Sequence, residues 1–245
     1  MDGKTSFLYN ERTAFPAAST IKIFVLLELF NQIRAGKRQL DDFIEIPNGR
    51  FGEAGGRTSS GVLKDLESIP RISLKDAATL MIIVSDNVAT NLLIDLLGLE
   101  KIQDLIRNLG LKNTKFQRKM MDVESAARGL ENISTPYDMM ITLEQIGAAK
   151  IFDSNTCDTI LNILSRAQDV LGFRRLIPEN VVIEHKTGEI SEACHDVGIV
   201  RIPGNPVIIC VMTKGANLVQ RWDAIAEIGK LFYDHVSSEN WVNVK

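Results

Sequence analysis

Ser19 and Lys22 stand three residues apart at the start of a strongly apolar segment. In a helix this spacing places the two side chains on one face, one above the other. Ser19 falls in the predicted first turn, where the helix dipole and the backbone N–H groups favour a developing oxyanion. A lysine beside it can act as a base where burial lowers the lysine pKa. The pair predicts a nucleophilic serine with a lysine base; the alternative is that Ser19 is only a helix cap.

A second group of polar residues, Ser85, Asp86 and Asn87, falls in the short break predicted between two helices. A hydroxyl can relay a proton and an amide can hydrogen-bond to a substrate carbonyl, so these residue types suit the wall of a catalytic site. Ser, Asp and Asn also favour the N-cap position of a helix, and a purely capping role is the alternative.

A third group, Lys186, Thr187 and Gly188, is predicted to end a strand. A cation and a hydroxyl side by side on a sheet edge bind a carboxylate, and a glycine lets a substrate backbone approach closely. The alternative is an ordinary solvated strand end.

Hydrophobic periodicity and capping signals define the elements that must position these groups. Helices are predicted over residues 20–35, 73–83, 87–97, 100–109, from 135 onward, 154–167 and 221–236, with a short helical piece at 61–66 inside a glycine-rich loop at 47–70. Strands are predicted over residues 6–10, 181–183, 195–202 and 206–213.

Strands therefore lie toward both ends of the chain and helices in the middle. This order predicts an α+β fold: a mainly antiparallel sheet built from both chain ends with flanking helices, plus an inserted all-helical lobe. We expect one domain over residues 1–245, with an α/β lobe at about 1–46 and 170–245 and a helical lobe at about 47–169.

The composition is that of an ordinary globular protein, with 45% hydrophobic and 24% charged residues among 245 and a net charge of −3. Charges of both signs are interspersed, so a nucleic-acid partner is not expected. The apolar stretches are too short to span a bilayer. Neither a nucleic-acid partner nor a membrane span is therefore expected.

Three widely spaced cysteines, Cys157, Cys194 and Cys210, argue against a disulfide framework or a zinc site and fit a reducing compartment. No apolar leader follows Met1, so the sequence as written predicts a cytoplasmic protein. Neither a metal nor an organic cofactor is expected.

The three motifs, in this order and at this spacing, resemble the signature set of penicillin-recognising serine enzymes. The sequences at residues 15–22, 81–93 and 226–229 are similar to class A β-lactamases in particular, and the resemblance covers almost the whole chain. It implies a β-lactamase/D,D-peptidase-like fold and a serine hydrolase activity. Many members of the family are exported, which leaves the cellular location open.

The resemblance also implies roles for the motif residues. Ser19 is then the nucleophile and Lys22 its hydrogen-bond partner and possible base. Ser85 passes a proton to the leaving nitrogen, and Asn87 holds both Lys22 and the amide chain of the substrate.

The same resemblance assigns the carboxylate of the substrate to Lys186 and Thr187, beside Gly188. The oxyanion hole is implied to consist of the backbone N–H groups of Ser19 and Glu189. An alanine is common at the latter position, but only the backbone is needed there.

The chain departs from the family pattern at the residue that clears the acyl-enzyme. Met120 falls two residues after Arg118, where the resemblance implies a glutamate. Asp122 and Glu124 are the nearest carboxylates, and Glu124 is the candidate replacement; the alternative is that both are surface charges. We therefore expect slow deacylation.

Two further departures concern the substrate carboxylate and the N-terminus. Val197 and Trp222 occupy the two places where family members carry a helping arginine, and Arg221 is one residue away. The family also has a helix and a strand before the equivalent of residues 6–10. We expect either that upstream residues are missing from this sequence or that residues 6–10 pair directly with residues 207–212.

The resemblance therefore implies a β-lactamase-type serine hydrolase that opens a small-molecule substrate, a β-lactam or related amide, through an acyl-enzyme on Ser19. The alternatives are a related serine hydrolase acting on a D-alanyl peptide or an ester, and a covalent β-lactam binder without efficient turnover.

Overall fold

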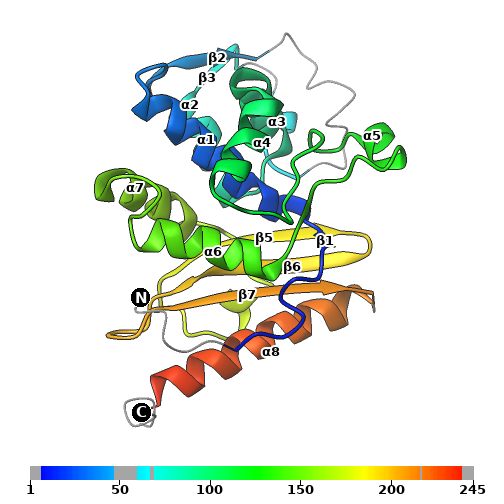
Figure 1. Ribbon diagram of the computed structural model, residues 1–245, viewed down its shortest axis with the longest axis vertical. Helices are drawn as coiled ribbons and strands as arrows, with labels where there is room; N and C mark the ends of the chain where they lie inside the picture. The colour runs from blue at the N-terminus through cyan, green and yellow to red at the C-terminus, as the bar shows by residue number, and fades with distance from the viewer. Residues whose placement is uncertain (1–6, 47–59, 67–68, 216, 239–245) are drawn as a thin grey trace. The chain divides into compact units, whose positions relative to one another are not determined.

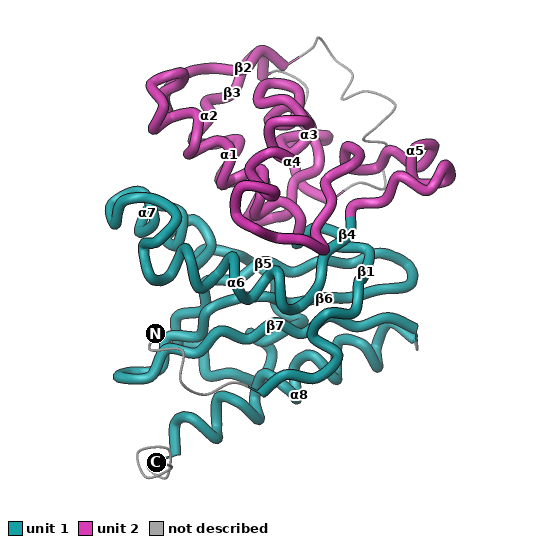
Figure 2. The backbone as a smooth tube through the Cα atoms, in the orientation of Figure 1, with its two compact units in different colours: residues 1–20, 133–245 teal, residues 21–132 magenta. Residues whose placement is uncertain are grey.

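The computed structural model describes residues 7–46, 60–66, 69–215 and 217–238. The chain divides into two compact units, and Figure 2 colours them separately. The first unit comprises residues 1–20 and 133–245, and the second comprises residues 21–132. Each unit is described by itself below.

The first unit contains a three-stranded antiparallel sheet in the order β5, β6, β7. These strands are β5 (Ile183–Ile190), β6 (Ala193–Val200) and β7 (Val207–Lys214). Every residue of the central strand β6 is buried. The strand predicted at 181–183 overlaps β5 only at Ile183, since Val181 and Val182 precede the strand. The K-T-G sequence, which was predicted to end a strand, lies inside β5, because the strand continues to Ile190.

Helices cover both faces of this sheet. Figure 1 shows α6 (Pro136–Gly147) and α7 (Ser154–Ser165) on one face and α8 (Leu218–Ser237) on the opposite face. Because both faces are covered, β5 is buried over most of its length even where its residues are polar. The core on the α8 side includes Phe173, Ile183, Cys194, Ile209 and Ile225.

The N-terminal end contributes less to the first unit than predicted. The strand expected over residues 6–10 is wrong for its described part, residues 7–10, which form coil and a bend, while Ser6 lies outside the described residues. Asn10 has φ of +50°, which interrupts an extended chain. Instead, β1 (Phe15–Pro16) pairs antiparallel with β4 (Ile133–Ser134). The α+β class and the antiparallel arrangement of the strands are confirmed.

The second unit is mainly helical. Its central helix α1 (Lys22–Arg34) contacts α2 (Leu74–Ile83), α3 (Asn87–Leu97) and α4 (Leu99–Asn108). Residues 23–30 of α1 are all buried, in agreement with their apolar sequence. A 3-10 turn, η1 (Ala18–Ile21), leads directly into α1, so the predicted helix at 20–35 is confirmed with a tighter start.

Smaller elements complete the second unit. A short hairpin pairs β2 (Phe43–Glu45) with β3 (Arg71–Ser73), and the short helices η3 (Leu63–Asp65) and α5 (Val123–Ala127) lie in connecting segments. In the first unit, η4 (Phe173–Arg175) is a similar short helix. The predicted loop at 47–70 falls largely outside the described residues.

Side-chain caps explain where most helices begin. Ser73 accepts a hydrogen bond from the backbone N–H of Asp76 at the start of α2, and Thr135 accepts one from Asp138 at the start of α6. Asp86 and Asp153 cap α3 and α7, and Asn217 forms a capping box at α8. The helix starts predicted at Ser73 and Thr135 are confirmed, whereas α8 begins at Leu218, ahead of the predicted start at Arg221.

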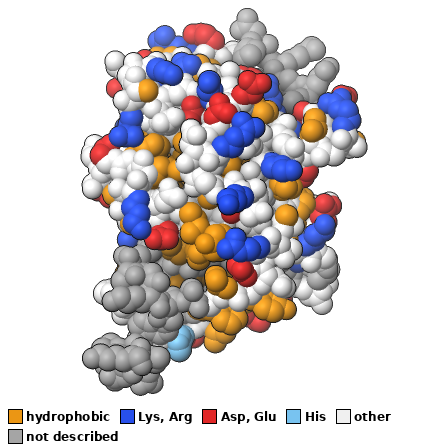
Figure 3. Space-filling view, viewed as in Figure 1, with side chains coloured by type: hydrophobic (Ala, Val, Ile, Leu, Met, Phe, Trp, Pro, Cys, Tyr) orange, Lys and Arg blue, Asp and Glu red, His pale blue; other side chains and the backbone are white. Residues whose placement is uncertain are grey.

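Basic and acidic side chains alternate over the face shown in Figure 3, as the sequence indicates. None of the described helices combines the length and apolar character that crossing a membrane requires.

Candidate active site

Ser19 lies in the first turn of η1, where backbone N–H groups have no acceptor within the helix. Ala18, directly before it, has φ of +47°, a conformation that is uncommon for a residue with a side chain. Gly188 of β5 lies against this turn: a Cβ atom at Gly188 would come within 3.0 Å of the Ser19 backbone nitrogen. The first unit therefore brings the serine and the K-T-G sequence together, and only glycine leaves room for that approach.

The backbone of β5 next to Gly188 presents hydrogen-bonding groups at an open edge. A two-residue turn joins β5 to β6, so the closing pair Ile190 and Ala193 is hydrogen-bonded, and the next pair, Glu189 and Cys194, is not. The Glu189 N–H therefore points away from β6, toward the edge of β5 that has no partner strand among the described residues. This is the edge that Ser19 approaches.

Lys186 is fully buried, and its ammonium group donates a hydrogen bond to the carbonyl of Thr187 at 3.0 Å. Burial lowers the pKa of Lys186, and the nearby carboxylates of Asp169, at 3.8 Å, and Asp196 oppose this shift. Asp196 also accepts from the backbone N–H of Phe173 and pairs with His185, both at 2.9 Å. A cation is thus held beside Thr187 by fixed negative groups.

His195 of β6 stabilises the segment that leads into Ser19. It lies opposite Gly188 in the β5–β6 register, and its Nε2 atom is 2.7 Å from the carbonyl oxygen of Pro16. A carbonyl can only accept, so Nε2 carries the proton, and Nδ1 accepts from the backbone N–H of Thr213 at 3.3 Å. Burial lowers the pKa of His195 to about 4. A neutral imidazole therefore fixes Pro16, three residues before Ser19.

In the second unit, Lys22 at the start of α1 is fully buried and contacts the S-D-N sequence. Its Nζ atom donates to the Ser85 carbonyl at 2.7 Å, to Ser85 Oγ at 3.0 Å and to Asn87 Oδ1 at 2.7 Å. Because Ser85 Oγ accepts from the lysine, its own hydrogen remains available for another acceptor. The lysine, the hydroxyl and the amide thus form one hydrogen-bonded group.

Ser85 is held in a strained conformation that Asp86 stabilises. Ser85 has φ of +54°, a left-handed conformation that is uncommon outside glycine. The buried carboxylate of Asp86 accepts from the backbone N–H groups of Val62, Leu63 and Ala89 at 2.7–2.9 Å. It therefore ties the residue after Ser85 to α3 and to the segment at 62–63.

The segment from Gln117 to Asn132 is closed by side-chain bonds between its two ends. The Arg118 guanidinium makes two hydrogen bonds with the Glu131 carboxylate, at 3.0 and 2.9 Å. The Asn132 amide accepts from the backbone N–H groups of Gln117 and Arg118 and donates to the Arg118 carbonyl. The arginine thus pairs with Glu131, and Asn132 binds the backbone.

Within this segment, Asn91 of α3 fixes Met120 through its backbone. The Asn91 amide accepts from the Met120 N–H at 2.9 Å and donates to the Met120 carbonyl at 3.1 Å, and the Met120 side chain is buried. Asp122 caps α5 by accepting from the N–H and the hydroxyl of Ser125, and these bonds lower the Asp122 pKa. Glu124 is exposed in the first turn of α5.

The two positions where the sequence suggested a helping arginine hold buried side chains of other types. Val197 is buried in β6. Trp222 is buried in α8 and donates its indole N–H to the Glu189 carboxylate at 2.7 Å. The neighbouring Arg221 is also buried, and its guanidinium donates to the carbonyls of Ser191 and Gly215. Arg221 therefore braces the β5–β6 turn.

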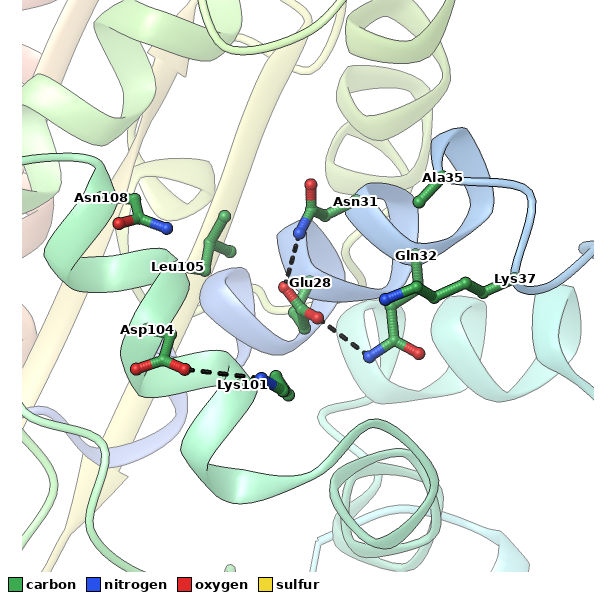
Figure 4. Close-up of a pocket in the computed structure, with 9 residues that line it drawn as sticks. All are labelled: Glu28, Asn31, Gln32, Ala35, Lys37, Lys101, Asp104, Leu105 and Asn108. Atoms are coloured by element: carbon green, nitrogen blue, oxygen red, sulfur yellow. Dashed lines mark hydrogen bonds and ion pairs between the residues drawn. The ribbon is translucent and has the colours of Figure 1, made fainter.

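A separate pocket of 220 Å³ lies in the second unit and is lined by none of the motif residues. Figure 4 shows the buried Glu28 carboxylate accepting hydrogen bonds from the amides of Asn31 and Gln32, and an ion pair between Lys101 and Asp104. These contacts connect α1 internally and stabilise the surface of α4.

The structure thus groups the predicted site residues in two sets. In the first unit it places Ser19 beside the strand that carries Lys186, Thr187, Gly188 and Glu189. In the second unit it joins Lys22, Ser85 and Asn87 through hydrogen bonds.

The sequence interpretation missed three supporting residues, His195, Asp196 and Asn91. The His-Asp pair in the strand after K-T-G was the available signal for the first two, since titratable residues there must be buried. The described part of the chain contains no group of three or more His, Cys, Asp or Glu side chains that could hold a metal ion.

Comparison with known proteins gives a consistent result. A family model described as "Beta-lactamase enzyme family" matches residues 1–236. The curated β-lactamase CARB-4 of Pseudomonas aeruginosa is 25% identical over 240 residues, which are 95% of this chain and 81% of that protein.

Solved structures are also similar. A β-lactamase from Sphaerobacter thermophilus is 30% identical with a TM-score of 0.87, over 95% of this chain and 88% of that one. A point mutant of PBP-A, solved as an acyl-enzyme complex with penicillin G, is 25% identical with a TM-score of 0.84, over 96% and 87% of the two chains.

Proposed function

The chain belongs to the beta-lactamase enzyme family, and from that premise we propose that it opens β-lactams by acylation of Ser19 and releases the product slowly. The observation that carries the proposal is the position of Lys22 Nζ, 2.7–3.0 Å from Ser85 and Asn87. This lysine joins the Ser-x-x-Lys motif and the S-D-N motif in one hydrogen-bonded group that can transfer protons. Lys22 follows the proposed nucleophile, Ser19, by three residues.

In the proposed acylation, Lys22 has first lost one proton and so keeps two of the three hydrogen bonds described above. Ser19 Oγ then attacks the lactam carbonyl carbon while the Lys22 amine takes the serine proton. The C–N bond of the ring then breaks, an ester forms on Ser19, and the leaving nitrogen receives a proton from Ser85. Ser85 regains a proton from Lys22, so the proton lost by the serine ends on the amine. Asn87 keeps the lysine oriented and binds the amide chain of the substrate.

The first unit supplies the binding groups of this proposal. The N–H groups of Ser19 and Glu189 stabilise the oxyanion. Lys186 and Thr187 bind the substrate carboxylate, and Gly188 allows the close approach of serine and strand.

Slow deacylation follows from the residues around Met120. A thioether cannot accept a proton from the attacking water. Asp122 is engaged with Ser125, which makes it a weak base, and Glu124 is exposed to solvent. General-base help is worth about 10² to 10⁴ in rate, so its loss leaves an acyl-enzyme that accumulates.

This same observation favours a second candidate function. A covalent β-lactam binder, or a related serine hydrolase that acts on a D-alanyl peptide or an ester, needs acylation but not fast hydrolysis of a β-lactam ester. Met120 in place of a base is compatible with either role.

Intact-mass measurements over time with benzylpenicillin test the proposal. We expect an adduct of the whole penicillin on Ser19 that forms quickly and decays slowly, and no adduct in Ser19→Ala. Fast turnover by Ser19→Ala would rule the mechanism out.

A second pair of variants tests the account of deacylation. Met120→Glu introduces a base on a backbone that Asn91 holds, and should speed decay of the adduct by about a hundredfold or more. Met120→Gln, of the same shape but without a base, is the control. Equal decay rates for both variants would contradict the account, whatever the rate of acylation.

A further inference from the structure

Glu189 carries a carboxylate that Trp222 holds in place. The indole N–H donates to Glu189 Oε2 at 2.7 Å, and the indole itself is buried in α8 while Glu189 is exposed. A hydrogen bond from a buried ring restricts the carboxylate to one position on the surface of β5. This carboxylate has no part in the mechanism above, which uses only the backbone of Glu189.

The carboxylate lies next to the groups that bind substrate in that mechanism. Glu189 follows Gly188 directly, and its own N–H faces the open edge of β5. Side chains two residues apart on a strand share one face and lie about 7 Å apart, so Glu189 is on the same face as Thr187. A ligand bound by Thr187 and by the Glu189 N–H is therefore within reach of this negative charge.

Within the described residues, the carboxylate of Glu189 has no direct ion-pair partner, and its indole partner is neutral. A cation nearby is the buried guanidinium of Arg221, since both it and Glu189 act on the pKa of the Cys194 thiol. The guanidinium of Arg221 is directed to the carbonyls of Ser191 and Gly215. Lys186 alternates to the other face of the strand and donates to the Thr187 carbonyl.

We propose that Glu189 is a specificity-determining residue that selects β-lactams by charge, favouring those with a cationic substituent over those with a second carboxylate. The inference rests on the proposed function, because it needs acylation of Ser19 to be measured. Unit charges about 8–10 Å apart near a protein surface change a rate by roughly three- to tenfold.

One variant separates this role from a structural one. If Glu189 only anchors the β5–β6 turn to α8, its function is to accept the indole hydrogen bond. Glu189→Gln retains an acceptor oxygen for Trp222 and removes only the charge. Glu192→Gln, which removes an exposed carboxylate from the adjoining turn, is the matched control.

The experiment compares acylation rate constants for ampicillin, benzylpenicillin and carbenicillin, which share one nucleus and differ by an ammonium, no charge or a carboxylate on the side chain. It is run at about pH 6, where an α-amino group is protonated. We expect the original protein to favour ampicillin over carbenicillin. Because the two penicillins differ by two unit charges, Glu189→Gln should reduce that ratio by about ten- to a hundredfold. Added salt should reduce the ratio in the original protein but change it little in Glu189→Gln.

Glu192→Gln should leave the ratio unchanged. The inference is overturned if Glu189→Gln keeps the original ratio, or if Glu192→Gln lowers it equally, while benzylpenicillin still acylates Ser19. If none of the three penicillins forms an adduct on Ser19, the proposed function itself fails and this inference fails with it.

Discussion

His195 connects a buried strand to the segment that leads into Ser19. Its imidazole has both nitrogen atoms engaged, one as a donor to Pro16 and the other as an acceptor from Thr213. Protonation of Nδ1 would replace that acceptor with a donor facing another donor. The arrangement of bonds therefore requires the neutral ring.

This requirement predicts a pH dependence of stability. Burial lowers the pKa of His195 from 6.5 to about 4. Between pH 6.5 and about pH 4 the unfolded chain binds a proton at this histidine that the folded chain does not bind. The free energy of unfolding therefore has its full value above pH 6.5 and decreases as the pH is lowered toward 4. The full shift corresponds to roughly 3 kcal/mol.

Urea unfolding of the original protein and of His195→Gln across this pH window provides the measurement. The free energy of unfolding should fall more steeply toward low pH in the original protein. Burial raises the pKa of Glu184, which acts in the opposite direction in both proteins, so the difference between the two slopes isolates the histidine. Parallel slopes would contradict the prediction.

The sequence identifies the residues of the motifs but not the residues that hold them. Ser19, Ser85 and Lys186 belong to short patterns whose chemistry is local. His195 acts on Pro16, which is 179 positions away, and nothing in the spacing of the sequence indicates that contact.

At the scale of elements, the start of α3 depends on one buried carboxylate. Both oxygens of Asp86 are used, Oδ1 by Ala89 and Oδ2 by Val62 and Leu63. The cap of α7 differs, because Asp153 is exposed and accepts from Thr156 within its own helix.

Replacement of the two aspartates by asparagine should therefore have different effects. In Asp86→Asn the new amide nitrogen can only donate, so the backbone N–H group that it faces loses its acceptor. The free energy of unfolding should therefore decrease by about 2–4 kcal/mol. In Asp153→Asn a good cap remains, with a loss below about 0.5 kcal/mol. Chemical denaturation of both variants measures the difference, and equal losses would show that Asp86 is an ordinary cap.

The helices were predictable because their capping residues are local signals, as Ser73 and Thr135 illustrate. The burial of β5 was not predictable, since the polar K-T-G sequence is equally typical of a solvated strand end. The two-residue strands β1 and β4 carry too few residues for any periodicity.

At the scale of the molecule, all three cysteines belong to the first unit and none forms a disulfide. Cys157 and Cys194 are buried, and burial raises the pKa of the Cys194 and Cys210 thiols. Their reactivity is therefore a measure of whether this unit is folded.

We expect a thiol reagent such as DTNB to modify the native protein slowly at neutral pH. In urea all three thiols should react together, at the concentration where circular dichroism reports unfolding. Prompt modification of one cysteine in the native protein would show local opening near that residue.

The family and the α+β class were predictable for the whole molecule, because the motifs extend over most of the chain. The division into units was less accessible: the structure separates residues 21–132 from the rest, whereas the sequence suggested boundaries near 46 and 170. The order of elements along the chain does not indicate that α6 and α7 pack on the sheet or that α1 packs with α2, α3 and α4.

The attachment of Met120 by its backbone has an evolutionary consequence. Asn91 and the Arg118–Glu131 pair set the path of the segment without using the Met120 side chain. A codon change at this position therefore alters the chemistry offered there while the supporting contacts persist. On the proposed mechanism, successive mutations at this one site would carry a lineage under antibiotic selection between trapping a drug and destroying it.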